Sequence, residues 1–234
     1  TERTHTLAQR PSTVHHATAL LPERIGATPA PAYDVSAACA GYAYGIPPCV
    51  WGSAAERVID ATIEKLGGLD ILVNNAATNP YAGPTIDVDR PRWEKTLDVN
   101  LSAPLFWTQL AWQRSLKQNG GTVINISSVG GLGTSAILGV YDITKAALIH
   151  LTKQLAAELG PKVRVNAIAP GLFGTPMVMS LGDEVVASLE ESVEAPKRVG
   201  RMEEFAHACA FLIENSYMNG ATLRLDAATR LRAR

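Results

Sequence analysis

The sequence contains few cysteines, few aromatic residues and no excess of either charge. Its three cysteines, Cys39, Cys49 and Cys209, form neither a disulfide framework nor the spacing of a zinc site, so we expect no bound metal. Lys and Arg number 21 against 22 Asp and Glu. This balance gives no electrostatic reason to expect nucleic acid or an anionic membrane surface as a partner.

Long hydrophobic runs and a signal peptide are also missing from the sequence. The longest apolar runs fall far short of the roughly 20 residues that cross a bilayer, and the first residues do not follow the pattern of a secretory signal. Hydrophobic residues make up 47% of the 234 residues, which is enough for the core of one large α/β domain. We therefore expect a soluble, cytoplasmic protein.

A glycine-rich phosphate-binding turn is the most informative absence. Such a turn lets a cofactor pyrophosphate approach backbone N–H groups at a helix N-terminus, and no turn of this kind occurs before Leu69. Pro47 and Pro48 break regular structure and mark a boundary. We predict an atypical N-terminal segment, residues 1–51, followed by a catalytic body, residues 52–234, together forming one compact domain.

The stretch with the clearest chemistry begins with a tyrosine and a lysine four residues apart. Apolar spacing predicts a helix there, so Tyr141 and Lys145 share a helix face. An ammonium beside a phenol favours the phenolate, so we expect the pKa of Tyr141 to be lowered toward neutrality, where it can exchange protons with a carbonyl or an alcohol. Ser128 follows an apolar strand and could hold the same oxygen. An isolated Tyr-x-x-x-Lys pair also fits a solvated surface.

The surrounding motifs resemble the short-chain dehydrogenase/reductase family over residues 53–234. They comprise residues 69–76 (LDILVNNA), Asn100 within a long helical pattern, the Ser128–Tyr141–Lys145 spacing, and residues 163–171 (VRVNAIAPG) followed by Thr175. The resemblance implies an α/β fold of the Rossmann-like kind, a doubly wound parallel sheet with helices on both faces. It also implies a nicotinamide cofactor. The residues that select NADP or NAD follow the glycine-rich turn in the family, so both cofactors stay open.

The same resemblance assigns roles to individual residues. Tyr141 is the acid/base, Lys145 lowers its pKa and positions the cofactor ribose, and Ser128 holds the substrate oxygen. The backbone carbonyl of Asn100 anchors a proton-relaying water, unless that residue is simply satisfied within its own helix. The cofactor-binding residues that the resemblance implies are Asn74, Ala76, Tyr141, Lys145, Pro170, Gly171 and Thr175. The turn at Asn74 also fits a plain left-handed backbone.

Further features bear on substrate and assembly. The C-terminal region is similar to ketoacyl reductases and hydroxyacyl-CoA dehydrogenases, which implies a ketone or secondary alcohol as substrate, with a 3-oxoacyl thioester as one candidate. Residues 177–191 resemble the substrate lid of the family. Ala227 stands where glycine is usual and would be strained at positive φ.

Phe106 and Trp107 belong to an unusually apolar helix. Family members pair this helix across a two-fold axis, so we expect a homodimer or homotetramer, unless the rings pack inside.

A second resemblance concerns the N-terminal segment. Residues 34–42 (DVSAACAGY) are similar to the nucleophile region of ketoacyl-acyl carrier protein synthase III, with Cys39 at a helix N-terminus that would lower its pKa. The histidine and asparagine signatures of those enzymes, HQAN and GNTS, do not occur. Three functions therefore stay open: a hydride-transferring oxidoreductase, an acyl-condensing or acyl-transfer protein that uses Cys39, and a catalytically silent reductase fold.

Overall fold

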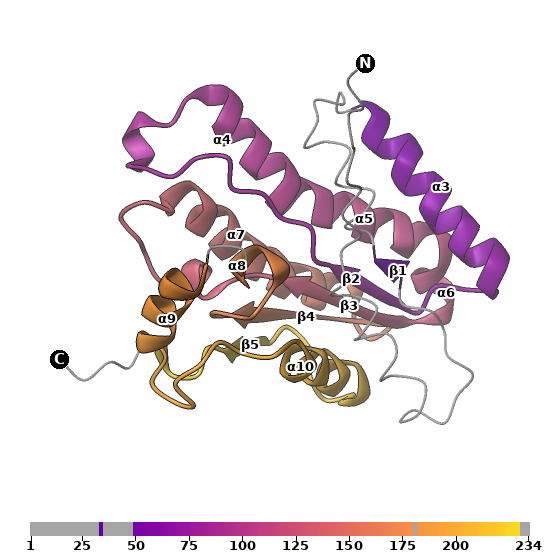
Figure 1. Ribbon diagram of the computed structural model, residues 1–234. Coiled ribbons are helices and arrows are strands. Elements are labelled where there is room, and N and C mark those ends of the chain that lie inside the picture. The colour runs from indigo at the N-terminus through magenta and orange to yellow at the C-terminus, as the bar shows by residue number, and fades with distance from the viewer. Residues whose placement is uncertain (1–32, 35–48, 180–181, 230–234) are drawn as a thin grey trace, which may run out of the picture.

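The computed structural model describes residues 33–34, 49–179 and 182–229 (Figure 1). Within them, five parallel strands form one sheet in the order of the sequence. The strands are β1 (Tyr33–Asp34), β2 (Ile71–Asn74), β3 (Gly121–Ile126), β4 (Val163–Pro170) and β5 (Thr222–Leu225). The predicted strand around Tyr33 is thus present in part. Cys39, its surrounding motif and the helix expected at residues 10–25 lie outside the described residues.

The central strands are buried on both faces, as in most parallel sheets. Val123 and Ile124 are neighbours on β3 and point to opposite faces, yet both are fully buried. β3 pairs with β2 from Ile71↔Thr122 onward and with β4 from Gly121↔Val163 onward. All carboxyl ends therefore meet at one edge, which is the edge that binds ligands in open α/β sheets.

Helices cover both faces of the sheet (Figure 1). One face packs against α3 (Cys49–Leu66), α5 (Ala103–Ala111) and α7 (Gly139–Leu159), and its core includes the fully buried Trp107. The other face packs against α10 (Met202–Glu214) through Cys209 and Leu212. The predicted α/β fold with helices on both faces is confirmed. The helix predicted from Tyr141 is α7, which begins two residues earlier, at Gly139, and continues to Leu159; its Leu155 is buried against the core.

The long helical pattern before β3 is interrupted by two wider turns that the sequence did not predict. In order, it consists of α4 (Arg90–Leu97), the π-helix η3 (Asp98–Ser102), α5, the π-helix η4 (Trp112–Leu116) and α6 (Lys117–Asn119). Pro104 has no N–H, so it cannot donate the α-helical bond to the carbonyl of Asn100. The widened turn η3 accommodates this missing bond.

The remaining elements are short. They are the 3₁₀ turns η2 (Thr85–Asp87) and η5 (Val129–Leu132), and α8 (Pro176–Met179) and α9 (Asp183–Glu191) in the region predicted as a lid. α10 ends at Glu214, and Asn215 is its C-cap. There the Arg164 guanidinium of β4 donates to four backbone carbonyls, one of them that of Leu212 at 2.8 Å. These bonds satisfy the otherwise unpaired end of the helix.

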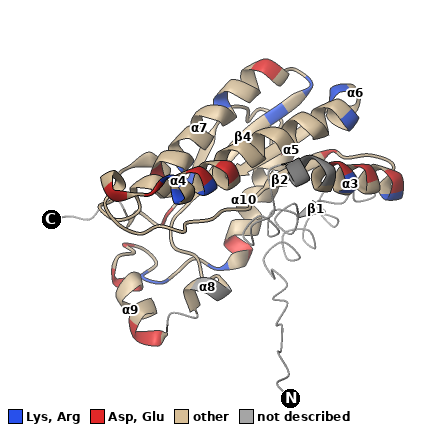
Figure 2. Cartoon of the chain, turned by 90° about the horizontal axis from the view of Figure 1, so that it is seen from above, with Lys and Arg blue, Asp and Glu red and all other residues tan. Residues whose placement is uncertain are grey.

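The surface of the described part carries both signs of charge. Acidic and basic residues are interspersed along α3 and α4, whereas α9 is acidic (Figure 2). No helix of the described part is both long and apolar enough to cross a membrane. In those same ranges no three His, Cys, Asp or Glu side chains come together as metal ligands would.

Candidate active site

Two elements bring the predicted catalytic residues to the carboxyl edge of the sheet. β3 ends at Ile126 and delivers Ser127 and Ser128 there, and α7 places Tyr141 in its first turn. Between them, η5 packs directly on α7. A Cβ on Gly131 would lie 2.6 Å from the backbone carbon of Lys145, so only glycine allows this close approach. The turn thereby fixes the serine strand against the tyrosine helix.

Tyr141, Lys145 and Ser128 form one cluster. Ser128 acts on the Tyr141 hydroxyl and lowers the pKa of the phenol, and the Lys145 Nζ lies 5.5 Å from the centroid of the Tyr141 ring. Ser128 Oγ also accepts from the N–H of Gly130 at 3.1 Å. The three side chains that the sequence predicted to act together therefore do meet in the structure.

Lys145 is a buried amine with unused hydrogen-bonding capacity. Its side chain is almost fully enclosed, with 1% exposure, and Nζ donates to the carbonyl of Ile126 at 2.7 Å. Burial lowers its pKa from 10.5 to about 7, because the charged form loses its hydration. An ammonium has three N–H donors, so two remain beyond the bond to Ile126. Ser127, predicted to support the backbone, does so by donating to the Lys145 carbonyl at 2.8 Å.

The pKa of Tyr141 is raised, so the expectation that Lys145 lowers it toward neutrality is wrong in this structure. Burial of the phenol is the main cause, Ser128 acts in the opposite direction, and the charge of Asp142 raises the pKa further. Lys145 does not offset this, because its amine is itself desolvated and directed at Ile126. Tyr141 therefore keeps its proton at neutral pH, which suits a proton donor. Sequence reasoning did not single out Asp142, because its burial depends on the fold of η5 over α7.

Asn100 joins three elements through its side chain. It is fully buried; Oδ1 accepts from the N–H of Thr78 at 2.8 Å, and Nδ2 donates to the Thr78 carbonyl and to Thr144 Oγ1, both at 3.0 Å. Its partners thus lie outside its own helix, in the loop after β2 and in α7. The carbonyl of Asn100 has no α-helical donor because of Pro104, which leaves it able to accept another hydrogen bond.

Asn74 and Ala76, which are predicted to bind the cofactor, lie at and just after the end of β2. Their side chains pack in the protein interior. Asn74 is 4% exposed and donates to Asn125 Oδ1 at 2.8 Å and to Thr108 Oγ1 at 3.3 Å. Its Oδ1 has no hydrogen-bond partner among the described residues. Ala76 packs against the core under α3 and α5. The backbone of this turn, rather than the Asn74 side chain, reaches the carboxyl edge.

The predicted nicotinamide-side residues follow β4, the strand next to β3. Pro170 ends the strand, and the N–H of Gly171 donates to the Leu225 carbonyl at 2.9 Å. A Cβ on Gly171 would lie 3.0 Å from Asp226 Cα, so the close packing here requires glycine. Thr175 Oγ1 accepts from the N–H of Val178 at 3.3 Å at the start of α8. This loop therefore shares the edge that carries Ser128 and Tyr141.

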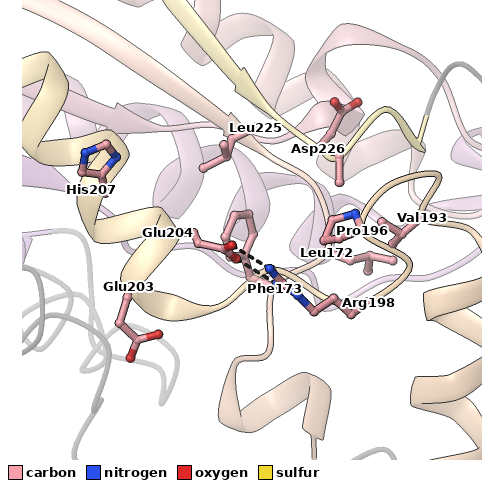
Figure 3. A pocket seen from close by; sticks show the side chains of 12 residues that line it. Leu172, Phe173, Val193, Pro196, Arg198, Glu203, Glu204, His207, Leu225 and Asp226 are labelled. Carbon is pink, nitrogen blue, oxygen red and sulfur yellow. Dashed lines mark hydrogen bonds and ion pairs between the residues drawn. The ribbon is translucent and has the colours of Figure 1, made fainter.

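A cavity of about 450 Å³ lies beside this loop, and the segments just before and just after the lid region contribute to its lining (Figure 3). Neither Tyr141 nor Ser128 lines it. Arg198 binds Glu204 across its wall with two hydrogen bonds, at 2.7 and 2.9 Å. Leu172, Phe173, Val193, Pro196 and Leu225 supply its apolar lining. Sequence reasoning missed this cavity, because its walls come from segments far apart in the chain.

Comparison with known proteins agrees with this geometry. A family model described as enoyl-(acyl carrier protein) reductase matches residues 52–227. Dehydrogenase/reductase SDR family member 4 of Homo sapiens is 37% identical over 179 residues, which cover 74% of this chain and 64% of the relative. Tropinone reductase-like 3 of Erythroxylum coca is 35% identical over 178 residues, 74% of this chain and 68% of the relative.

Solved structures show the same fold. ElxO with NADP bound superposes with a TM-score of 0.72 and 27% identity, covering 77% of this chain and 75% of that one. An apo SCOR enzyme from Clostridium thermocellum gives 0.68 and 26%, covering 78% and 71%.

The chain belongs to the short-chain dehydrogenase/reductase family, whose Rossmann fold its parallel sheet shares. It spans 64% of the length of the SDR family member 4 proteins of Pongo abelii and Homo sapiens. The family-model match begins at residue 52, so the resemblance of residues 34–42 to a ketoacyl synthase stays a prediction.

Proposed function

We propose that the protein transfers a hydride between a nicotinamide cofactor and a ketone or secondary alcohol. The observation that carries this proposal is the cluster in which Tyr141, whose pKa responds to Ser128, lies beside the buried amine of Lys145. A phenol positioned by a serine at the carboxyl edge of a parallel sheet is placed to exchange a proton with a substrate oxygen.

In the direction of reduction, Tyr141 donates its proton to the carbonyl oxygen, which becomes the alcohol. Ser128 donates a hydrogen bond to the same oxygen and so stabilises the negative charge that develops on it. The carbonyl of Asn100, to which Pro104 cannot donate, provides an acceptor for a water that relays a proton toward Lys145. Because the pKa of Tyr141 is raised, we expect reduction to proceed at neutral pH and alcohol oxidation to require alkaline pH.

The residues present fit the nicotinamide half of NADP or NAD. The two spare N–H donors of Lys145 suit ribose hydroxyls, and Thr175 and the backbone at Pro170–Gly171 would hold the nicotinamide end. When bound, the cofactor supplies or accepts the hydride; the protein supplies orientation and the proton. The solved structure of the related ElxO contains NADP, which supports this cofactor class. The lack of a glycine-rich turn in the sequence predicts weaker binding of the pyrophosphate.

A 3-oxoacyl thioester is the substrate that we favour within this class. The matching family model is described as enoyl-(acyl carrier protein) reductase, a name that concerns an acyl chain carried as a thioester and so supports the thioester part of this substrate. The lid region also exposes apolar side chains, Met179 at 50% and Val185 at 46%, which can cover an acyl chain as adaptable contacts. We expect turnover of a 3-oxoacyl thioester to exceed that of a small cyclic ketone.

The test combines cofactor binding with a matched pair of tyrosine variants. Titration with NADH and NADPH followed by fluorescence measures binding, and loss of nicotinamide absorbance with a 3-oxoacyl thioester measures turnover. Y141F is expected to retain cofactor binding and lose about 100-fold or more in kcat. Y217F alters a tyrosine that is 97% exposed and should leave both unchanged. No binding of either cofactor at millimolar concentration would leave only the catalytically silent fold.

A further inference from the structure

The loop of residues 129–138 joins Ser128 to the first turn of α7. It begins with η5, and residues 132–137 are exposed. An exposed loop keeps its place mainly through the hydrogen bonds that tie it to the rest of the protein. The proposed mechanism needs this loop to be fixed, because Ser128 has to reach the same substrate oxygen as Tyr141.

Asp142 binds the middle of this loop from α7. It follows Tyr141 in the first turn of the helix and is 5% exposed. Its Oδ2 accepts a hydrogen bond from Ser135 Oγ at 2.8 Å, and Ser135 Oγ in turn accepts from the N–H of Leu138 at 3.0 Å. Leu138 is the N-cap residue of α7 and offers no side-chain cap. Ser135 therefore links the carboxylate to the start of the helix.

The other carboxylate oxygen of Asp142 lies against Gly130. A Cβ built on Gly130 would collide with Asp142 Oδ1, whereas its distance from Ser128 Oγ, 3.5 Å, is an ordinary contact. The φ of Gly130 lies outside the left-handed region, so the carboxylate, and not the backbone conformation, excludes a side chain here. The N–H of Gly130 donates to Ser128 Oγ at 3.1 Å. Contacts therefore run without a gap from Asp142 to Ser128.

Backbone groups hold the two ends of the same loop. At its start, Ser127 Oγ donates to the Lys145 carbonyl at 2.8 Å, and the N–H of Gly131 donates to the Ser128 carbonyl at 3.0 Å. At its end, the N–H of Gly83 donates to the Ile137 carbonyl at 2.9 Å. The stretch between these ends is the part that Asp142 reaches.

We propose that Asp142 is a positioning residue that acts through Ser128: its carboxylate holds residues 129–138 against α7 and so fixes the Ser128 hydroxyl relative to the substrate oxygen. This inference rests on the proposed function, which gives Ser128 its role. The contacts of Asp142 with Gly130 and Ser135 are a property of the protein alone. Loss of the carboxylate should loosen the loop and slow turnover, and it should leave cofactor binding unchanged.

Hydrogen exchange tests the anchoring without substrate or cofactor. D142A should raise the exchange rates of the Gly130 and Leu138 amides by roughly 5- to 10-fold, because the bonds that protect them lose their support. The matched control is E158A, which removes an exposed carboxylate near the other end of the same helix and should leave both rates unchanged. Unchanged rates in D142A would overturn the proposal.

A methyl group at position 130 tests the contact from the other side. In the wild-type background, G130A places its methyl against the Asp142 carboxylate and should lower the urea midpoint. D142A vacates that space, so G130A should cost little or nothing in the double variant. Losses that simply add in G130A/D142A would show that the carboxylate does not lie against Gly130, and the proposal would fail.

Kinetics in an S128A background separates positioning from a general structural effect. In the wild-type background, D142A should lower kcat by about 10-fold or more with the cofactor KM unchanged. D142N keeps an oxygen that can accept from Ser135 and should recover most of that loss. In S128A, D142A should cause no further fall, because the residue through which it acts is gone. An equal fall in both backgrounds would indicate a merely structural role and contradict the proposal.

Two controls keep these outcomes distinct. If S128A and Y141F both retain full turnover, the proposed function fails, and the exchange rates still decide whether Asp142 anchors the loop. If circular dichroism shows that D142A is misfolded, S135A takes its place, since it alters an exposed residue and removes only the hydroxyl. S135A should then speed exchange at Leu138 and lower kcat in the wild-type background but not in S128A; failure of either result would overturn the proposal.

Discussion

At the residue scale, two alanines near the C-terminus have a backbone conformation that favours glycine. Ala227 has φ 48° and Ala228 has φ 59°. The prediction of strain at Ala227, made from its position in the family pattern, is therefore confirmed. For a residue with a Cβ, the left-handed region costs roughly 1–2 kcal/mol, and glycine avoids this cost at the expense of greater freedom in the unfolded chain.

We therefore expect A227G to raise the free energy of unfolding by about 0.5–1 kcal/mol, measured by urea denaturation. The matched control is A146G on the exposed face of α7, where φ is helical and glycine should lower the free energy of unfolding by about 1 kcal/mol. Equal effects of the two substitutions would contradict strain at Ala227.

Lys145 makes the stability of the fold depend on pH. Its pKa is about 7 in the folded protein, against an ordinary value of 10.5. Between about pH 7 and pH 10.5, Lys145 is protonated in the unfolded chain but neutral in the folded protein. Lys145 therefore makes the free energy of unfolding rise with pH across this window. Below about pH 7 the free-energy cost of burying its charge is fully present. The K145M substitution removes this cost of burying the charge. It also removes the hydrogen bond to the Ile126 carbonyl, which is worth about 1 kcal/mol.

K145M should therefore be more stable than the wild type at about pH 6.5, by an amount on the order of a few kcal/mol. The advantage should shrink toward pH 10. Urea midpoints across this range test the prediction, with K153M, an exposed lysine of the same helix, as a control that should show no such trend. A difference between K145M and wild type that stays constant with pH would rule it out.

At the element scale, Asn100 connects the widened turn η3 to two other segments. Its three side-chain hydrogen bonds reach Thr78 and Thr144. Residues outside the helix therefore hold η3 in place, at the point where Pro104 cannot donate to the Asn100 carbonyl. Each such bond contributes about 1 kcal/mol, and a buried donor left without a partner costs more.

We expect N100A to lower the free energy of unfolding by about 3 kcal/mol, again measured in urea. T144S keeps the hydroxyl that accepts from Asn100 and should cost less than about 1 kcal/mol. If N100A were no more damaging than T144S, the link between η3 and its neighbours would have no energetic weight.

At the scale of the whole molecule, local spacing predicted that Tyr141 and Lys145 share a helix face, whereas the family resemblance implied the parallel α/β fold and the other site residues. Four residues on a helix bring Tyr141 beside Lys145, and an apolar strand carries Ser128 to the sheet edge. The pKa of Tyr141 could not be predicted in this way, since its burial and the charge of Asp142 depend on how η5 folds over α7. The cavity beside the loop after β4 escaped prediction because several separate segments form its walls.

The outer surface of the helical layer bears on assembly. Trp107, which the sequence offered as a candidate for a subunit interface, is 1% exposed and packs in the core. In contrast, Phe106 on α5 is 54% exposed and Ile143 on α7 is 44% exposed. Both helices cover the same face of the sheet. A stable interface buries about 800 Å² on each partner, and apolar side chains at its centre carry much of the energy. We infer that these helices pair two copies of the chain.

F106E and I143E should each convert a homodimer or homotetramer into a smaller species, because each buries a charge without a partner in the interface. Sedimentation equilibrium measures the mass, and I86E, at a site that is 92% exposed on η2, should leave it unchanged. A wild-type protein that remains monomeric at micromolar concentration would contradict the pairing. Because Ile143 lies two residues after Tyr141, dissociation should also loosen the first turn of α7. In protein labelled with ¹³C at the tyrosine ζ carbons, the NMR resonance of Tyr141 should therefore change in I143E but remain unchanged in I86E.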